Sequence, residues 1–309
     1  MIDKGFLDIL KSHPYISRDI KVTTFQNPYN ILVLDNLFNE DIEDQISIKF
    51  YKLISKVKKP FGEVGEGSGL IYNALIYGLY DEDCTDGYDF FTSKEWKNYI
   101  EKTFGLNLNQ HLAYSVHYHL GNKFKKSESG WSHSDSSFCS AIDDNSKAWK
   151  ISGRDCEYAD DEEDKKNTKV TKMARAVAVL YYFNNKKKFG IDDGGGTNIF
   201  TAENRDTPLF EVEPKNNRAL VFEINPLSYH AFNGANFNRS AIVHWFHSSP
   251  PEWTHRNLDL LKKKMKLLPD ADIVDRWKKG KIWRLDNHPD YSKFFNKSYE
   301  DLLKEIKGQ

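Results

Sequence analysis

Between Tyr114 and Ser248 the chain is a series of short runs rich in β-branched and aromatic residues, separated by turn-forming residues. Such runs predict strands, and their close spacing favours an all-β sandwich or barrel over alternating β and α units. Each strand must bury one face against another layer, so this pattern constrains the fold more than any other feature. The runs are AYSVHYHL, ARAVAVLYYFN, TNIFT, RALVFEI and RSAIVHWFH.

The segments on either side of these runs have helical patterns. Residues 1–110 are predicted to be a mainly helical support region, in which Asn39 caps one helix and Thr92–Glu95 forms a capping box for another. Residues 111–250 form the expected β core, and residues 251–309 form a helical extension. We expect the three parts to make one compact unit.

Within the expected core, residues 143–172 are polar and include the charged run DCEYADDEEDKK. A charge run of this kind usually forms a solvated loop. Because the segment follows the HxD sequence described below, it is also a candidate for an insertion or lid that orders over a substrate.

The composition argues against several classes of protein. Lys and Arg number 44 against 45 Asp and Glu, so the net charge of −1 gives no general attraction to nucleic acid or anionic membranes. The longest strongly apolar run, Ala176–Phe183, is far shorter than the roughly 20 residues that span a bilayer. Three scattered cysteines form neither a disulfide framework nor a zinc-binding pair. We therefore expect a cytoplasmic protein with no nucleic-acid or membrane partner.

A candidate metal site begins at His133-Ser134-Asp135. Alternate residues of a strand point to the same face, so the imidazole and the carboxylate converge. A second histidine from elsewhere would complete the two-histidine, one-carboxylate set that binds non-haem Fe(II) and leaves coordination positions open. Short motifs of this kind also arise by chance, so the residues further along the chain decide.

Downstream of this motif, features follow in an order that resembles the prolyl 4-hydroxylase-like branch of the Fe(II)- and 2-oxoglutarate-dependent oxygenases. The likeness covers roughly residues 114–248. It rests on Tyr118-His119-Leu120-Gly121 before the HxD motif, Tyr181-Tyr182-Phe183-Asn184, Gly194-Gly195-Gly196, PKNNRALVF at 214–222, His230, Arg239 and Trp245.

The resemblance implies a double-stranded β-helix, or jelly roll, with helical flanks. It also implies that His133, Asp135 and His230 bind iron and that Arg239 pairs with the distal carboxylate of 2-oxoglutarate. Tyr182 and Tyr118 would give hydroxyl groups to that carboxylate. The cofactors implied are Fe(II), 2-oxoglutarate and O2, and the resemblance allows ascorbate as well. The implied activity is that of a dioxygenase that hydroxylates a C–H bond.

Several alternatives remain open at this stage. The implied substrate is a prolyl residue in a peptide or protein, and the alternative is a free amino acid or another small metabolite. His117 and His119 form a second same-face pair that could bind a metal. A cupin-like metal-binding protein without catalytic activity would keep the histidines but would not need Arg239, and a scaffolding barrel would need neither.

Overall fold

The computed structural model describes residues 4–57, 74–119, 121, 132–136, 138–142, 150–152, 170–185 and 193–267. The helices in these ranges are α1 (Lys4–Lys11), α2 (Glu40–Ile54), η1 (Asp81–Asp83), η2 (Tyr88–Thr92), α3 (Lys94–Phe104) and α4 (Pro250–Leu267). The strands are β1 (Lys21–Phe25), β2 (Ile31–Asp35), β3 (Ala74–Gly78), β4 (His111–His119), β5 (His133–Ser134), β6 (Phe138–Ile142), β7 (Lys150–Ser152), β8 (Val170–Phe183), β9 (Thr197–Ile199), β10 (Phe210–Val212), β11 (Arg218–Glu223), β12 (Tyr229–Phe232) and β13 (Arg239–Ser248).

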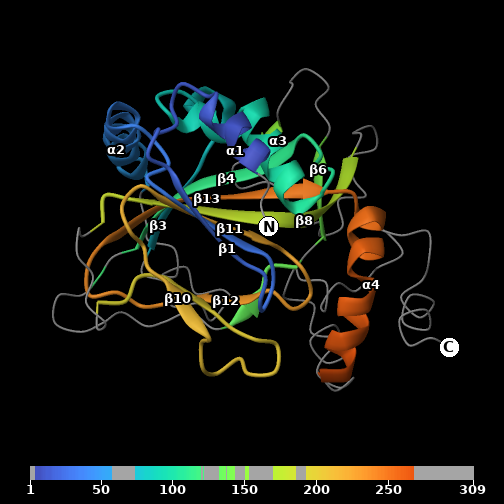
Figure 1. Ribbon diagram of the computed structural model, residues 1–309. Coiled ribbons are helices and arrows are strands. Elements are labelled where there is room, and N and C mark those ends of the chain that lie inside the picture. The colour runs from blue at the N-terminus through green and yellow to red at the C-terminus, as the bar shows by residue number, and fades with distance from the viewer. Residues whose placement is uncertain are drawn as a thin grey trace.

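Two β-sheets lie face to face, and α1, α2 and α3 cover the outer face of the larger one (Figure 1). The larger sheet has the strand order β1-β2-β11-β8-β13-β4-β3, with β6 also beside β8 and β7 also beside β4. The smaller sheet has the order β10-β9-β12-β5. Of the described strand pairs only β4 with β7 is parallel. This is the double-stranded β-helix with helical flanks that the strand pattern and the resemblance predict.

The N-terminal region contributes more than helical support. β2 pairs with β11, and β1 pairs with β2 at the edge of the larger sheet. β3 pairs with β4 at the opposite edge. β1, β2 and β3 therefore belong to the same larger sheet as the strands of the expected β core.

The helix starts follow side-chain capping, with one difference from the sequence prediction. The side chain of Asn39 accepts a hydrogen bond from the backbone N–H of Ile42, as expected for the cap of α2. For α3 the capping residue is Ser93, which accepts from the backbone N–H of Trp96. The predicted capping box at Thr92–Glu95 is therefore wrong by one residue, because Trp96 and not Glu95 occupies the third helical position.

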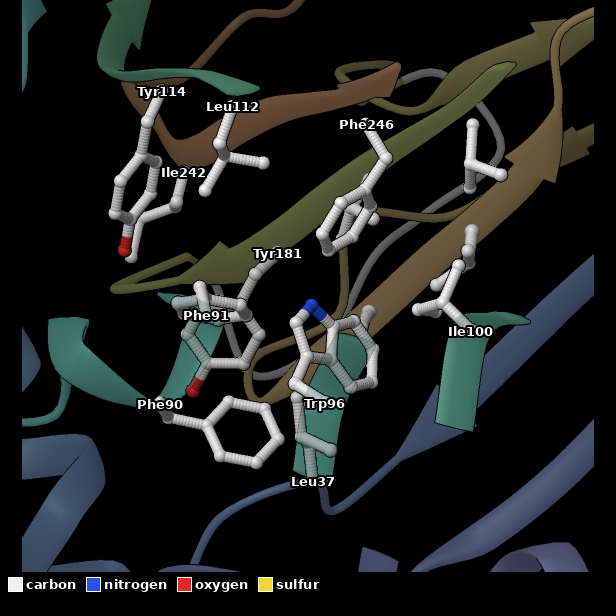
Figure 2. Packing of buried hydrophobic residues seen from close by; sticks show 14 of the residues in the cluster. Leu37, Phe90, Phe91, Trp96, Ile100, Leu112, Tyr114, Tyr181, Ile242 and Phe246 are labelled. Atoms are coloured by element: carbon white, nitrogen blue, oxygen red, sulfur yellow. The ribbon is translucent and has the colours of Figure 1, made fainter. Parts of the chain in front are cut away.

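This layering gives a hydrophobic core on each face of the larger sheet. The helix-side core lies between the larger sheet and α1–α3, and Trp96, Phe91 and Tyr181 are among its completely buried side chains (Figure 2). Truncation of a buried aromatic side chain to alanine typically costs about 3–5 kcal/mol of stability. The inter-sheet core lies between the two sheets and includes Tyr182 and Phe222. The functional candidates lie on this second side.

An irregularity in the ladder between β8 and β13 affects which side chains reach the inter-sheet side. Trp245 pairs with Ala178 and Phe246 with Val177, but His247 pairs with Arg175, so β8 has one extra residue, Ala176. Such a bulge breaks the alternation of side chains along a strand. Ala176 and Val177 both pack in the helix-side core, and Arg175 therefore faces the inter-sheet side.

Some expectations fall on residues outside the described ranges. Of the proposed insertion at 143–172, the structure describes only β7 and the first residues of β8, and of the extension at 251–309 it describes α4. No described helix combines the length and the apolar character that crossing a bilayer requires.

Candidate functional site

The residues of the predicted metal set lie together at the edge of the smaller sheet. His133 on β5 pairs directly with His230 on β12, and their ring centres are 4.6 Å apart. The carboxylate oxygens of Asp135 lie 3.7 Å from His133 Nε2 and 3.6 Å from His230 Nε2. All three potential ligand atoms lie within 4.8 Å of one another, so the three side chains could hold one metal ion.

The chemistry of this donor set fits Fe(II). Two imidazole nitrogens and one carboxylate leave positions open on the metal, and non-haem Fe(II) enzymes use this combination. In the part of the chain that the structure describes, no other group of three histidine, cysteine or carboxylate side chains comes equally close. The alternative pair, His117 and His119, thus lacks a third ligand there.

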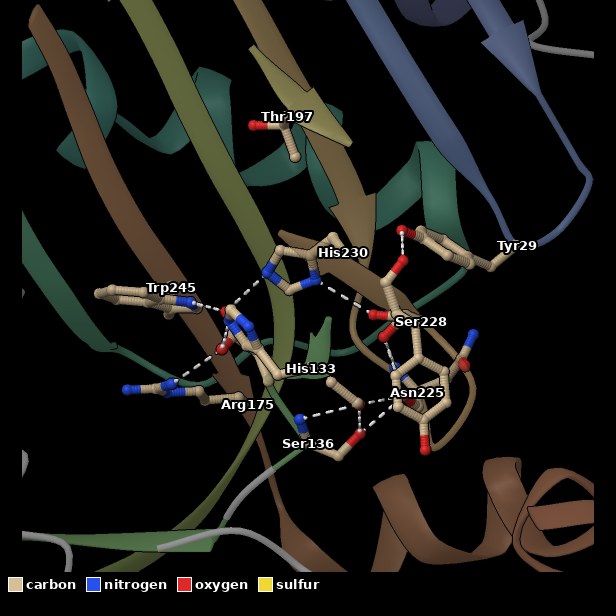
Figure 3. A network of polar contacts seen from close by, with 12 residues as sticks. Tyr29, His133, Ser136, Arg175, Thr197, Asn225, Ser228, His230 and Trp245 are labelled. Atoms are coloured by element: carbon tan, nitrogen blue, oxygen red, sulfur yellow. Dashed lines mark hydrogen bonds and ion pairs between the residues drawn. The ribbon is translucent and has the colours of Figure 1, made fainter. Parts of the chain in front are cut away.

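Backbone contacts fix the orientation of the His230 ring. Its Nδ1 lies 3.1 Å from the backbone carbonyl oxygen of Ser228, where an Nδ1–H group can donate a hydrogen bond (Figure 3). A proton on Nδ1 leaves the lone pair on Nε2, the nitrogen that faces Asp135. In this tautomer Nε2 of His230 can bind a metal ion held together with Asp135.

Asp135 has two further partners from the larger sheet. The indole Nε1–H of Trp245 donates to Asp135 Oδ2 at 2.9 Å, and Arg175 Nη1 lies 3.7 Å from Oδ1 (Figure 3). The Arg175 guanidinium also lies over the Trp245 ring, 4.4 Å from its centre. These contacts hold the carboxylate in one orientation, as is common for carboxylates that bind metals.

The same surroundings keep Asp135 ionised. Burial of its carboxyl group raises the pKa. His230, Arg175 and His133, together with the hydrogen bond from Trp245, lower the pKa by more than burial raises it. The net effect is a pKa well below the usual range of an aspartate. Asp135 is thus a carboxylate, the form that binds a metal, throughout the neutral pH range.

Serine hydroxyls anchor the turn from which β12 starts. Ser134 Oγ and Ser136 Oγ lie 2.9 and 2.6 Å from the backbone carbonyl oxygen of Asn225, where both can donate (Figure 3). The Ser228 hydroxyl donates to the same oxygen at 2.8 Å. All three serines are buried, so the turn before His230 is fixed against the chain that carries His133 and Asp135.

A second part of the site surrounds Arg239, the first residue of β13. Arg239 is 2% exposed, and its guanidinium lies 4.9 Å from the ring centre of Tyr182 and 5.0 Å from that of Phe232. Phe232 follows His230 by two residues on β12, so both side chains point to the same face. Arg239 therefore contacts the same strand face that presents His230.

Tyr182 belongs to this part of the site, and Tyr181 does not. The Tyr182 ring lies in the inter-sheet core, and its hydroxyl lies 2.7 Å from Thr197 Oγ1. Tyr181 points to the opposite face, where its hydroxyl donates to Asn217 in the helix-side core. The pocket thus takes only one of the two tyrosines, as expected from the alternation of a strand.

The structure does not bring Tyr118 to Arg239, and this prediction is corrected. Tyr118 packs on the helix side, with its ring 5.7 Å from Phe50 and 6.5 Å from Tyr51. Its hydroxyl accepts a hydrogen bond from Asn238 Nδ2. The physical reason is the alternation along β4: residue 118 faces the helices, and its neighbours in the chain face the other sheet.

The other histidines of β13 have structural contacts. His244 is buried in the helix-side layer, where its Nε2 accepts a hydrogen bond from the Trp96 indole at 3.1 Å. His247 Nδ1 lies 3.0 Å from the backbone oxygen of His111. Two of the three glycines before β9 have positive φ angles, +67° at Gly194 and +86° at Gly195, so this segment is a tight turn.

Sequence reasoning missed two residues of the site. The sequence analysis does not single out Arg175, which directly precedes the apolar run Ala176–Phe183. An arginine that is buried beside such a run needs an anionic partner. Thr197, which lies opposite Phe232 on β9, was not recognised either. Trp245 was noted only as part of the resemblance, and its hydrogen bond to Asp135 gives it a function in the site.

A comparison with protein families agrees with this chemistry. The sequence model of the 2OG-Fe(II) oxygenase superfamily matches residues 153–247. No curated protein sequence matches the chain. Among solved structures, the chain is similar to a Trichoplax adhaerens prolyl hydroxylase solved with a hypoxia inducible factor peptide, at 14% identity and a TM-score of 0.46 over 70% of this chain and 82% of that one.

Two further solved structures show similar values. A Pseudomonas putida prolyl-4-hydroxylase has 14% identity and a TM-score of 0.41, covering 70% of this chain and 91% of that one. A collagen prolyl hydroxylase of Paramecium Bursaria Chlorella virus-1, solved with 2OG, has 12% identity and a TM-score of 0.41 over 71% and 96%. At these levels of similarity no residue role transfers from those proteins. Residues 153–247 thus match the 2OG-Fe(II) oxygenase superfamily, and the two-histidine, one-aspartate donor set fits the same chemistry.

Proposed function

We propose that this chain is a 2-oxoglutarate-dependent dioxygenase that hydroxylates a C–H bond of a prolyl residue in a peptide or protein. The observation that carries the proposal is that β12 presents His230 of the metal set and, two residues later, Phe232, which contacts Arg239. The candidate metal ligands and Arg239, an arginine that can pair with a dicarboxylate, therefore lie in the same space between the sheets. The order of the sequence features from Tyr181 to Trp245 supports the prolyl 4-hydroxylase-like branch in particular.

In this proposal His133, Asp135 and His230 hold the iron. The Ser228 carbonyl keeps Nε2 of His230 free to bind, and Trp245 and Arg175 hold the Asp135 carboxylate in place. Partners of this kind keep the ligands in position before the metal arrives. With Asp135 present as a ligand, hydroxylation is favoured over halogenation, which needs that position for a halide.

Arg239 would pair with the distal carboxylate of 2-oxoglutarate. Its planar guanidinium can bind both oxygens of a carboxylate, and hydrogen bonds to charged groups typically contribute about 1.5–3 kcal/mol. The Tyr182 ring lies against that guanidinium, and the Tyr182 hydroxyl would be a second donor beside Thr197. Because Arg239 is buried, the ion pair would form where water competes little.

When bound, Fe(II), 2-oxoglutarate and O2 supply the oxidation, in which the co-substrate becomes succinate and CO2 and one oxygen atom enters the substrate C–H bond. The chain supplies geometry and a largely dry environment for that step. The apolar residues of the inter-sheet core, including Ile199 and Phe222, line the space between the sheets and limit the entry of water.

The test is turnover of 2-oxoglutarate to succinate with Fe(II), O2 and ascorbate, in the presence of a panel of potential substrates. The panel pairs proline-containing peptides with the same peptides carrying alanine, and adds free proline and other free amino acids. We expect proline peptides alone to increase succinate formation and to gain the mass of one oxygen atom.

Two results would contradict this function in different ways. Oxygen incorporation into a free amino acid, with none into any peptide, would favour the small-metabolite alternative. Iron binding without any iron-dependent succinate formation would favour a metal-binding protein that is not an oxygenase. The variant His255→Ala is a suitable control for site variants, because His255 is an exposed histidine on α4.

A further inference from the structure

Two histidines at the end of β4, His117 and His119, face the space between the sheets. The alternation that turns Tyr118 toward the helices places His117 and His119 on the opposite face. The His119 ring stacks on Phe232, with ring centres 4.4 Å apart and an angle of 22° between the planes. His119 is only 8% exposed, so its imidazole belongs to the protein interior.

His119 lies next to Arg239. The two residues are direct partners in the register of β4 and β13, and both contact the Phe232 ring. Phe232 stands two residues from His230 on the same face of β12. His119 is therefore placed between the strand that presents a proposed iron ligand and the cation that would bind the co-substrate.

His119 is uncharged in this position. Burial lowers its pKa well below the ordinary value, and the positive charge of Arg239 and the neighbouring His117 lower it further. Burial and Arg239 likewise lower the pKa of His117, to about 3. A neutral imidazole carries one N–H donor and adds no second positive charge beside Arg239.

His117 is occupied differently from His119. Its Nε2 lies 2.8 Å from the hydroxyl oxygen of Ser115 on the same strand. His117 is also more exposed than His119. Of the two histidines, His119 is thus the one that combines deep burial, contact with Phe232 and direct pairing with Arg239.

We infer that His119 is a binding residue for 2-oxoglutarate, donating a hydrogen bond from its imidazole N–H to the dicarboxylate that pairs with Arg239. It takes the role that the sequence resemblance had given to Tyr118. A dicarboxylate suits this corner because it offers acceptors to both the guanidinium and the imidazole, whereas a neutral ligand would leave the buried Arg239 charge without compensation from the ligand. The inference rests on the proposed function of Arg239.

The experiment measures 2-oxoglutarate binding to the Mn(II)-loaded protein by calorimetry, without turnover. His119→Phe keeps a ring to stack on Phe232 but removes the donor, and we expect its Kd for 2-oxoglutarate to rise about tenfold or more. His119→Gln restores an N–H donor and should recover most of the affinity. Tyr118→Phe, on the same strand and the opposite face, should bind like the wild type.

The outcomes separate this inference from the proposed function. If the Mn(II)-loaded wild type does not bind 2-oxoglutarate, the proposed function fails. If the wild type binds, Arg239→Ala does not, and His119→Phe binds as tightly as the wild type, the proposed function stands and the assignment of His119 is overturned. Equal weakening in His119→Phe and His119→Gln, with both variants folded, would also overturn it, because the donor would then be irrelevant.

Discussion

The indole of Trp245 donates a hydrogen bond to Asp135 Oδ2 at 2.9 Å, linking the larger sheet to the proposed iron set. We predict that Trp245→Phe lowers the affinity for Fe(II) about tenfold, because loss of an outer hydrogen bond typically reduces metal affinity by about 10–100-fold. Phenylalanine keeps a ring under the Arg175 guanidinium, so the fold should persist. Titration with Fe(II) under anaerobic conditions measures the change.

Trp253→Phe is the matched control for that variant. Trp253 is also buried, and its indole donates to the backbone oxygen of Ile224 at 2.9 Å, a contact with no carboxylate. Its replacement should lower stability without changing the affinity for iron. An unchanged Fe(II) affinity in Trp245→Phe would mean that this bond does not position the ligand.

Removal of either histidine of the metal set should abolish turnover. We expect His133→Ala and His230→Ala to lose iron-dependent succinate formation and to remain folded, because the apolar cores do not depend on these rings. Succinate release and circular dichroism measure the two properties, with His255→Ala as the exposed control. Full activity in either site variant would rule out the proposed metal set.

Arg239→Ala should weaken 2-oxoglutarate binding by about one to two orders of magnitude, because that change in Kd corresponds to the free energy of a charge-assisted hydrogen-bonded pair. Iron affinity should change much less, since Arg239 is no member of the metal set. Calorimetry with the metal-loaded protein gives the Kd, and Arg18→Ala, at an exposed arginine, is the control. A Kd equal to that of the wild type would assign the co-substrate to another cation.

His244 should make the metal-free protein sensitive to acid. Burial lowers the pKa of His244 to about 3, whereas in the unfolded chain it titrates near its ordinary value of about 6.5. Between these values the unfolded chain binds a proton that the folded protein does not, so stability falls as the pH drops below about 6.5. The contribution is about 1.4 kcal/mol per pH unit for each such histidine.

The variant His244→Gln tests this sensitivity. Its side-chain oxygen can still accept the Trp96 hydrogen bond, but the group no longer titrates. Urea unfolding at several pH values between 6.5 and 4 should give a shallower loss of stability than in the wild type. Identical slopes in the two proteins would show that His244 is not the source.

Much of this architecture could be predicted from the sequence because the signals are local. The β-branched and aromatic runs are confirmed as β4, β8, β9, β11 and β13, and the cap of α2 is confirmed at Asn39. The short strands β1 and β2 were missed as parts of the sheet, because pairing with β11 is a long-range contact that leaves no local pattern.

The choice of Tyr118 failed for a similar reason. Resemblance aligns a segment only to within a residue or so, and a shift of one residue along a strand reverses the face to which a side chain points. The placement of Tyr182 had a stronger basis, since only one residue of the Tyr181-Tyr182 pair could face the pocket. The sequence therefore narrows a role to two neighbouring residues of a strand. The strand register in the structure decides which of the two faces the pocket.

The extra residue Ala176 in β8 has a consequence for how this chain can change. Counted back from Tyr182 with strict alternation, Arg175 would face the helices. The bulge shifts the alternation by one residue, so the Arg175 guanidinium points toward Asp135. If the same residues paired regularly, Ala176 would lie opposite His247, and the Arg175 side chain would turn toward the helices, away from the carboxylate. One extra residue in the pairing of β8 with β13 therefore sets the electrostatics of the proposed iron site.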